Sequence, residues 1–316
     1  MQNRVPQIDW LRCVFIVLMV MFHLVYLGGK YPFLKQVVYT FHMPAFLLIS
    51  GYLANMDKSI RAIGRQVWWL FVPYAVMEAG YVVMASVLPI REHIDGLTPG
   101  VFADKLLLHP LGPYWYLHTM MVCYVVYYAV SRLCGRMATV SFMCVLGLCM
   151  YAVAALSGLV SMDNAMYFMA GVLVRRSGAG FTSVFRPSWP AIVPLVLLCV
   201  VSPGGLHRFT LQGVVMTYLS MSLALAACGS LPRGGRASRL VLFVGANTLP
   251  ILLFSPLFTI VAKSFVPLFA FDPTAVLFTV VSVTFVIAGS LGVARLADVL
   301  HVSRLFCGRE RMLTGY

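Results

Sequence analysis

Residues 8–28, IDWLRCVFIVLMVMFHLVYLG, decide the fold of this chain, because they form an apolar run long enough to cross a bilayer. Two ionisable side chains interrupt the run, Arg12 and His23. Eleven helical residues turn by about 1100° and rise by about 16 Å, so these two side chains point within about 20° of each other. The sequence therefore predicts one helix that carries both polar groups on one face.

The composition indicates a membrane protein throughout. Hydrophobic residues make up 61% of the chain and charged residues 10%, a balance that excludes a water-soluble globule. No internal repeat, low-complexity tract or linker divides the sequence, so we expect a single integral-membrane domain over residues 1–316. The eight cysteines lie in or beside apolar runs without a C-x-x-C pair, which is typical of small core residues.

Apolar runs of roughly 20 residues predict about ten transmembrane helices. This is an all-α, polytopic fold, and the two short runs, 163–174 and 189–203, leave open an alternative of eight crossings with one re-entrant hairpin. The ten predicted segments are 8–28, 36–55, 66–89, 113–131, 138–158, 163–174, 189–203, 209–231, 240–263 and 273–297.

The basic residues predict the topology. The net charge of +13 would suggest a nucleic-acid partner in a soluble protein, but here the charges sit in short loops, and we expect no nucleic acid. With a cytoplasmic N-terminus, sixteen Lys and Arg side chains fall on the inside. The outside receives six, which are Lys30, Lys35, Arg91, Lys105, Arg208 and Lys263. Both termini are therefore predicted to be cytoplasmic.

Ionisable groups at membrane depth tend to face protein or water and to mark function. The predicted topology places Arg12 near the inner face and His23 in the outer half of the membrane. Three further groups fall near the His23 level: His42, His118 and Ser255. Depth alone thus suggests an outer polar chamber above a cationic inner entry.

Structural roles remain open for the same side chains. Arg12 can extend to the inner interface beside Asp9, three residues away on the same face. His42 and His118 can lie at the interface, and Glu78, near mid-membrane, can be a buried hydrogen-bonding partner. Since no two histidines share an i, i+4 spacing, we expect no metal site.

These residues carry a resemblance to the membrane-bound acyltransferase 3 family. Its first helix bears an Arg followed eleven residues later by a His, as DWLRCVFIVLMVMFH does at residues 9–23. TFHMPAFLLISGYL, residues 40–53, resembles the F-x-M-P-x-F-x-x-x-S-G-[FY] signature of the second helix, including Ser50. Its Phe-His-Met-Pro form is similar to the sugar O-acetyltransferase branch of the fucose 4-O-acetylase type.

Further matches follow along the chain. Arg65 with Pro73-Tyr74 resembles the basic loop before the third helix of the family, and PYWYLHTMM, residues 113–121, resembles a W-[FY]-L motif that includes Trp115 and Tyr116. VGANTLPILLFSPLF, residues 244–258, resembles a late-helix motif in which many members have a histidine at the position of Ser255. That departure weakens a mechanism with two histidines and places more weight on His23.

The resemblance implies an enzyme of the inner (plasma) membrane that transfers an acyl group, usually acetyl, from cytoplasmic acyl-CoA to a hydroxyl of an envelope or exported glycan. It implies that Arg12 and Arg65 bind acetyl-CoA, since guanidinium recognises phosphate. His23 is expected to act as a neutral base, or to be acylated and relay the group outward.

The remaining site candidates have expected supporting roles. His42, His118, Tyr116 or Ser255 would orient the acceptor or donate to the oxyanion. Two alternatives to an enzyme stay open: a transporter or flippase of a glycan or lipid-linked sugar, and an inactive relative that serves as an assembly partner. The sequence indicates no oligomeric state.

Overall fold

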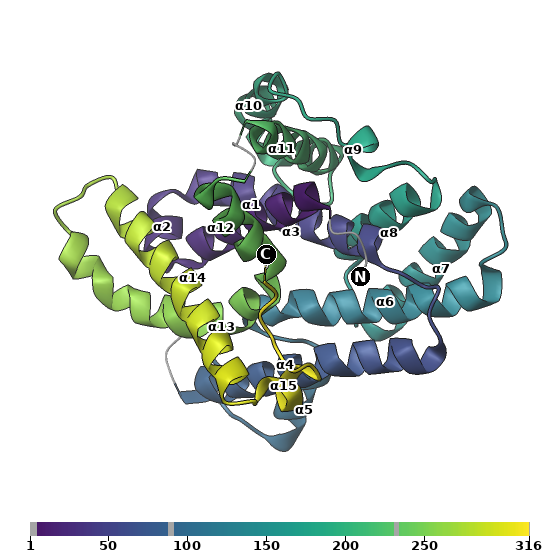
Figure 1. The fold of residues 1–316 in the computed structure, drawn as a ribbon, viewed down its shortest axis with the longest axis horizontal. Coiled ribbons are helices and arrows are strands. Elements are labelled where there is room, and N and C mark those ends of the chain that lie inside the picture. Colours follow the sequence, from purple (N-terminus) through teal and green to yellow (C-terminus); the bar gives the residue numbers. More distant parts are fainter. Residues whose placement is uncertain (1–4, 88–91, 231–233, 316) are drawn as a thin grey trace. The chain divides into compact units, whose positions relative to one another are not determined.

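The structure is a computed structural model that describes residues 5–87, 92–230 and 234–315. All regular secondary structure in these ranges is helical, which confirms the prediction of an all-α, polytopic membrane protein (Figure 1). The predicted ends of segments 66–89 and 209–231, together with Arg91, lie outside the described residues. The α-helices are α1 Pro6–His23, α2 Val25–Lys30, α3 Pro32–Leu53, α4 Ile60–Val87, α5 Pro99–Leu107, α6 Trp115–Cys134, α7 Thr139–Ser157, α8 Met162–Arg176, α9 Phe181–Val184, α10 Ile192–Val201, α11 Leu211–Gly229, α12 Arg236–Ala246, α13 Thr248–Ala262, α14 Val276–Val299 and α15 Ser303–Cys307.

Three short 3-10 helices join these elements: η1 Gly112–Tyr114, η2 Pro203–Gly205 and η3 Lys263–Phe269. Within the described ranges, seven helices are long and apolar enough to cross a membrane. The two short predicted segments appear as α8, with 15 residues, and α10, with 10 residues. Both are shorter than the roughly 20 residues that a straight crossing needs, so the count of ten crossings stays a prediction.

Two predicted segments are interrupted. The run 8–28 ends as a helix at His23, where Leu24 adopts an extended conformation before α2 begins. The run 240–263 is divided at Asn247, which ends α12 and precedes α13. The prediction of an uninterrupted helix was wrong at both points, because hydropathy does not detect a single residue that leaves the helical conformation inside an apolar run.

The chain folds into two compact units that interleave in sequence. The first unit contains Met1–Phe46, Gly180–His301 and Arg311–Tyr316, and the second contains Leu47–Ala179 and Val302–Glu310. The boundary near residue 46 falls inside α3. Each unit is described separately below, and the expectation of one domain over residues 1–316 stays a prediction.

Helix α1 is the central element of the first unit. It packs against α11, α12, α13 and α14, and its side chains at Leu11, Ile16 and Val20 are fully buried. Gly245 of α12 meets the backbone carbonyl of Asp9 so closely that an added Cβ would overlap it. A glycine at this point therefore allows the two helix backbones to approach each other.

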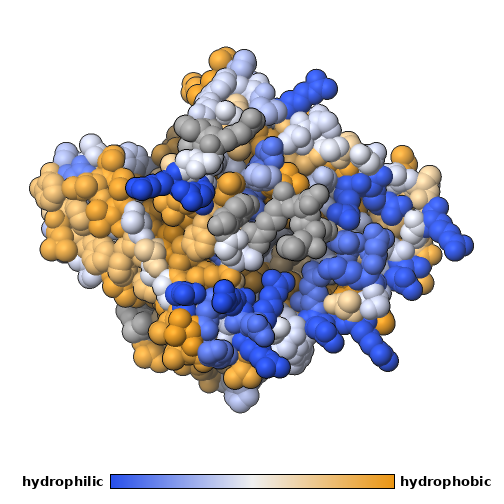
Figure 2. All heavy atoms as spheres, viewed as in Figure 1, coloured by the Kyte–Doolittle hydropathy of each residue, from blue (hydrophilic) through white to orange (hydrophobic). Residues whose placement is uncertain are grey.

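The outer surface of the first unit is apolar where α13 and α14 lie side by side. Large aliphatic side chains are exposed on both helices, among them Leu257, Val261, Val280 and Leu296. Figure 2 shows this region as a nearly continuous hydrophobic face. Such a face suits contact with lipid chains, because lipid chains and aliphatic side chains are both apolar.

The second unit contains a similar close approach between the end of α3 and α8. A Cβ added at Gly51 would overlap the carbonyl of Phe168, and one added at Gly171 would overlap the carbonyl of Leu48. Two glycines, one on each helix, thus face the backbone of the partner helix. Between such surfaces, van der Waals contact is the main source of helix association in a membrane.

We expect Gly171→Ala to destabilise the second unit, because the new methyl group must displace the backbone of α3. Overpacking of this kind costs about 1–3 kcal/mol, which lowers the midpoint of thermal unfolding in detergent. Gly147→Ala on α7 is the matched control, since nothing lies within 4 Å of the added Cβ. Equal unfolding midpoints for the two variants would contradict the close helix contact.

Candidate functional site

The break after His23 exposes the end of α1 to side chains of α3. The hydroxyl of Tyr39 donates to the carbonyl of Phe22 at 3.1 Å, so a side chain of α3 satisfies one of the carbonyl groups at the end of α1. Leu24, at the break itself, is buried. The interruption is therefore held in place by packing and by a hydrogen bond from the neighbouring helix.

The geometry of His23 indicates which ring nitrogen carries the proton. Nδ1 lies 2.7 Å from the carbonyl oxygen of Met19. A carbonyl oxygen only accepts hydrogen bonds, so Nδ1 carries the proton and Nε2 of the neutral ring carries the lone pair. His23 is half-buried. This arrangement is that of a histidine whose Nε2 can take a proton or act as a nucleophile.

His42 on α3 repeats this arrangement. Its Nδ1 lies 2.7 Å from the carbonyl of Val38, and its side chain is buried. The ring of Tyr39 lies near both imidazoles, with ring centroids 6.2 Å from His23 and 5.1 Å from His42. The structure therefore brings together His23, Tyr39 and His42, of which sequence analysis had predicted the two histidines at a common depth.

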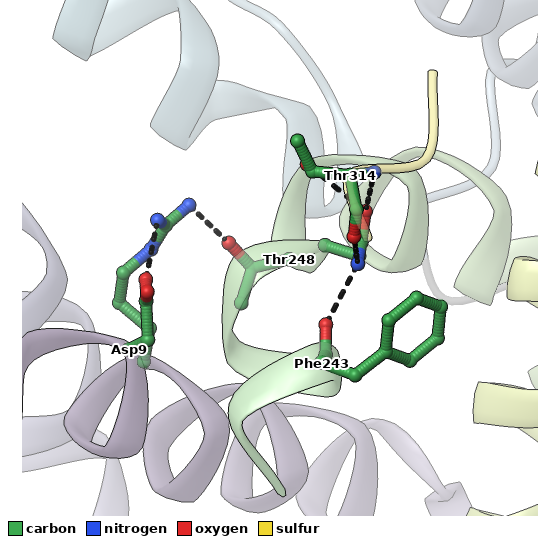
Figure 3. A network of polar contacts seen from close by, with 6 residues as sticks. Asp9, Phe243, Thr248 and Thr314 are labelled. Carbon is green, nitrogen blue, oxygen red and sulfur yellow. Dashed lines mark hydrogen bonds and ion pairs between the residues drawn. The ribbon is translucent and has the colours of Figure 1, made fainter. Parts of the chain in front are cut away.

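Arg12 lies on the same continuous helix as His23, which preserves the predicted alignment of the two side chains. Its guanidinium donates to Asp9 Oδ1 at 3.3 Å and to the hydroxyl of Thr248 at 2.7 Å (Figure 3). The Arg12 side chain is 27% exposed. These contacts use two of its five N–H donors and fix the direction of the planar group.

Asn247 creates the helix break from which Thr248 reaches Arg12. Its backbone N–H bonds to Val244, and its side-chain Nδ2 donates to the carbonyl of Phe243 at 2.7 Å, in place of the helical N–H. The side chain is 1% exposed. Asn247 thus satisfies the end of α12 and lets α13 begin in a new direction.

The C-terminal tail completes this network. Asn247 Oδ1 accepts from the backbone N–H of Thr314 at 2.8 Å, and Nδ2 donates to the Thr314 carbonyl at 3.0 Å (Figure 3). Asp298, near the end of α14, accepts from the N–H groups of Met312 and Leu313 at 2.5 and 3.1 Å. Sequence analysis missed Asn247, Asp298 and the tail. Two features of the sequence could have indicated these residues. Asn247 is a helix-capping residue type inside the apolar run 240–263, and Asp298 is a carboxylate directly after the run 273–297.

Ser255 is buried on α13, which packs against α1. Its predicted depth assumed an unbroken helix from residue 240. Since α13 begins at Thr248, Ser255 lies two turns from the start of its helix, and its depth relative to His23 stays a prediction.

In the second unit, Ser50 and Tyr116 form a pair. The two hydroxyls lie 2.8 Å apart, which joins the end of α3 to the start of α6. Trp115 is half-buried and packs edge-on against Tyr116, with ring centroids 6.4 Å apart. The two motifs that sequence analysis identified separately thus meet through side chains.

His118 and Glu78 hold the segment between α5 and α6. His118 Nε2 lies 2.9 Å from the carbonyl of Leu107, and Glu78 Oε1 accepts from the N–H of Leu111 at 2.6 Å. Both side chains are buried, and His118 belongs to the second unit, whereas His23 belongs to the first. His118 Nε2 is thus engaged with backbone, whereas His42 Nε2 has no hydrogen-bond partner among the described residues.

Arg65 is exposed on α4, also in the second unit.

Over the described ranges, no group of three or more His, Cys, Asp and Glu side chains lies close enough to hold a metal ion.

Comparison with known proteins identifies the family. The sequence profile of the acyltransferase 3 domain matches residues 5–295. The chain belongs to the acyltransferase 3 family. Nodulation protein NolL of Sinorhizobium fredii (strain NBRC 101917 / NGR234) is 29% identical over 136 residues, which cover 39% of this chain and 35% of NolL. The similarity thus spans about a third of that relative, and no solved structure matches the chain.

We expect Asn247→Leu to release the tail, because the substitution removes every hydrogen bond between residue 247 and Thr314 and leaves the Phe243 carbonyl unpaired. Buried groups left unsatisfied cost about 1–3 kcal/mol each. Trypsin should then cleave after Arg311 faster than in the wild type, as measured by mass spectrometry. Asn55→Leu is the control, since the Asn55 carboxamide bonds within its own exposed turn. Equal cleavage rates in both variants would show that Asn247 does not hold the tail.

Proposed function

We propose that this protein is a membrane O-acyltransferase that moves an acyl group, in the simplest case acetyl, from acyl-CoA on the cytoplasmic side to a hydroxyl of an envelope or exported glycan. The proposed location is the inner (plasma) membrane. The observation that carries the proposal is the Nδ1 contact of His23 with Met19, which leaves Nε2 as the proton acceptor on the same helix face as Arg12. Membership of the acyltransferase 3 family supports this chemistry.

Arg12 is proposed to bind the phosphates of the donor. Asp9 and Thr248 hold the guanidinium in one orientation, and its remaining N–H donors suit phosphate oxygens. His23 lies about 16 Å further along the helix, in the direction that the extended arm of the donor would take. Arg65, exposed in the second unit, is a second candidate for phosphate contact.

The proposed reaction uses Nε2 of His23 in either of two ways. In direct transfer, Nε2 takes the proton of the acceptor hydroxyl, and the hydroxyl oxygen attacks the thioester carbonyl. The C–S bond then breaks, and the leaving thiolate takes up the proton from Nε2. In a relay, Nε2 first attacks the thioester carbonyl, and the C–S bond breaks as the thiolate leaves. The acceptor hydroxyl oxygen then attacks the acyl carbonyl, the C–N bond to the imidazole breaks, and the hydroxyl proton passes to the thiolate. The Nδ1 contact with Met19 suits both routes, because it orients the ring.

A glycan carrier is the second candidate function. The breaks at Leu24 and Asn247 favour it, since interrupted helices line substrate paths in many transporters. A carrier moves its substrate without consuming a thioester. Purified protein that transports a glycan but neither hydrolyses acetyl-CoA nor transfers its acetyl group would overturn the enzyme proposal.

His23→Ala is expected to lower acyl transfer by at least about 100-fold, the usual contribution of a general base. The measurement is transfer from labelled acetyl-CoA to glycan by the full-length protein in detergent. Tyr39→Phe is the control for disturbance of the helix break, since it removes only the hydroxyl bound to Phe22. Wild-type turnover in His23→Ala would sink the assignment of His23.

Arg12→Ala is expected to weaken acetyl-CoA binding far more than Arg12→Lys, which keeps a positive charge. The dissociation constant can be measured by calorimetry on the purified protein. Arg295→Ala, at an exposed arginine of α14 in the same unit, controls for the loss of one positive charge. Unchanged affinity in both Arg12 variants would remove Arg12 from the donor site.

A further inference from the structure

His42 contains a buried hydrogen-bond acceptor that the proposed reaction does not yet use. The side chain is 2% exposed, and its Nδ1 is engaged with the Val38 carbonyl. Nε2 is buried and has no hydrogen-bond partner. A buried polar atom without a partner costs about 1–3 kcal/mol, so its presence calls for an explanation beyond packing.

Packing alone does not require this nitrogen. The contact of His42 with Tyr39, at 5.1 Å between ring centroids, is one that a phenylalanine would make equally well. The side chain at this position is nevertheless an imidazole, and the contact of its Nδ1 with the Val38 carbonyl fixes its tautomer. In that tautomer Nε2 can only accept a hydrogen bond, so His42 cannot donate to an oxyanion from this atom.

Two basic side chains, Arg208 and Lys35, lie in the neighbourhood of His42 and Tyr39. Arg208 lies near enough to act on His42 electrostatically, and so does His23. Lys35 lies 5.4 Å from the centre of the Tyr39 ring.

The natural donor to such an acceptor is a hydroxyl. Tyr39 lies near both histidine rings, so a small molecule bound against His23 is also close to the Tyr39 side of His42. Nε2 is not on the surface, so neighbouring side chains must move before a ligand hydroxyl reaches it, and the half-buried Tyr39 ring is one of these neighbours.

We propose that His42 Nε2 accepts a hydrogen bond from a second hydroxyl of the acceptor sugar while His23 acts on the hydroxyl that becomes acylated. This inference rests on the proposed function and specifies its acceptor as a polyhydroxylated ring that is held at two points. His42 then determines which hydroxyl of the ring faces His23. The acylated position is set by the distance between the two imidazoles.

The test compares methyl glycosides with their monodeoxy analogues as acceptors, with labelled acetyl-CoA as donor and full-length protein in detergent. For the wild type, one monodeoxy analogue should be acylated with a kcat/KM about 10-fold or more below that of its parent, because the His42 acceptor is left unpaired. His42→Phe should acylate parent and analogue with equal kcat/KM, because the unpaired acceptor is removed. His42→Gln, which offers a carbonyl oxygen, should restore part of the discrimination.

The outcomes separate this inference from the proposed function. If His42→Phe lowers kcat/KM for the parent and for every monodeoxy analogue by the same factor, or leaves the discrimination intact, His42 does not bind a second hydroxyl, although the enzyme proposal stands. If the wild type acylates no glycoside at all, the proposed function fails, and this inference fails with it.

Discussion

The structure depends on one constraint: inside an apolar bundle, every backbone group released by a broken helix must find a new partner. At the first break, the hydroxyl of Tyr39 reaches the carbonyl of Phe22. At the second, the side chain of Asn247 replaces the helical donor to Phe243. Both breaks lie beside a proposed functional group, His23 in one case and Thr248, the partner of Arg12, in the other.

The same constraint sets the chemistry of the histidines. His23 and His42 each direct Nδ1 to the carbonyl four residues earlier in their own helix. The backbone of their own helices therefore contributes to their orientation. His118 differs, since its Nε2 contacts the carbonyl of Leu107 in another segment. Its contact joins two segments of the chain, whereas those of His23 and His42 lie within their own helices.

Sequence analysis predicted the local features and missed the distant ones. The shared face of Arg12 and His23 and the pairing of Arg12 with Asp9 follow from helical periodicity, and the structure has both. The contact of Asn247 with Thr314 joins residues 67 positions apart, which no periodicity reports. The pairing of Ser50 with Tyr116 was inaccessible for the same reason, although both motifs had been recognised. The two helix breaks were not predicted, because hydropathy is averaged over a window of residues that is longer than the break.

Helix α1 is continuous between Arg12 and His23, and it ends at His23. Between Arg12 and His23 it contains no glycine or proline, and α11, α12, α13 and α14 pack against it. Arg12 is held to the start of α13 by Thr248, so the position of the inner group depends on the break at Asn247. His23 stands at the last residue of the helix, where its ring meets α3. A rigid helix with one polar group tied at each end keeps the two groups at a fixed separation. Under the proposed function, that separation sets the length of donor that reaches from Arg12 to His23.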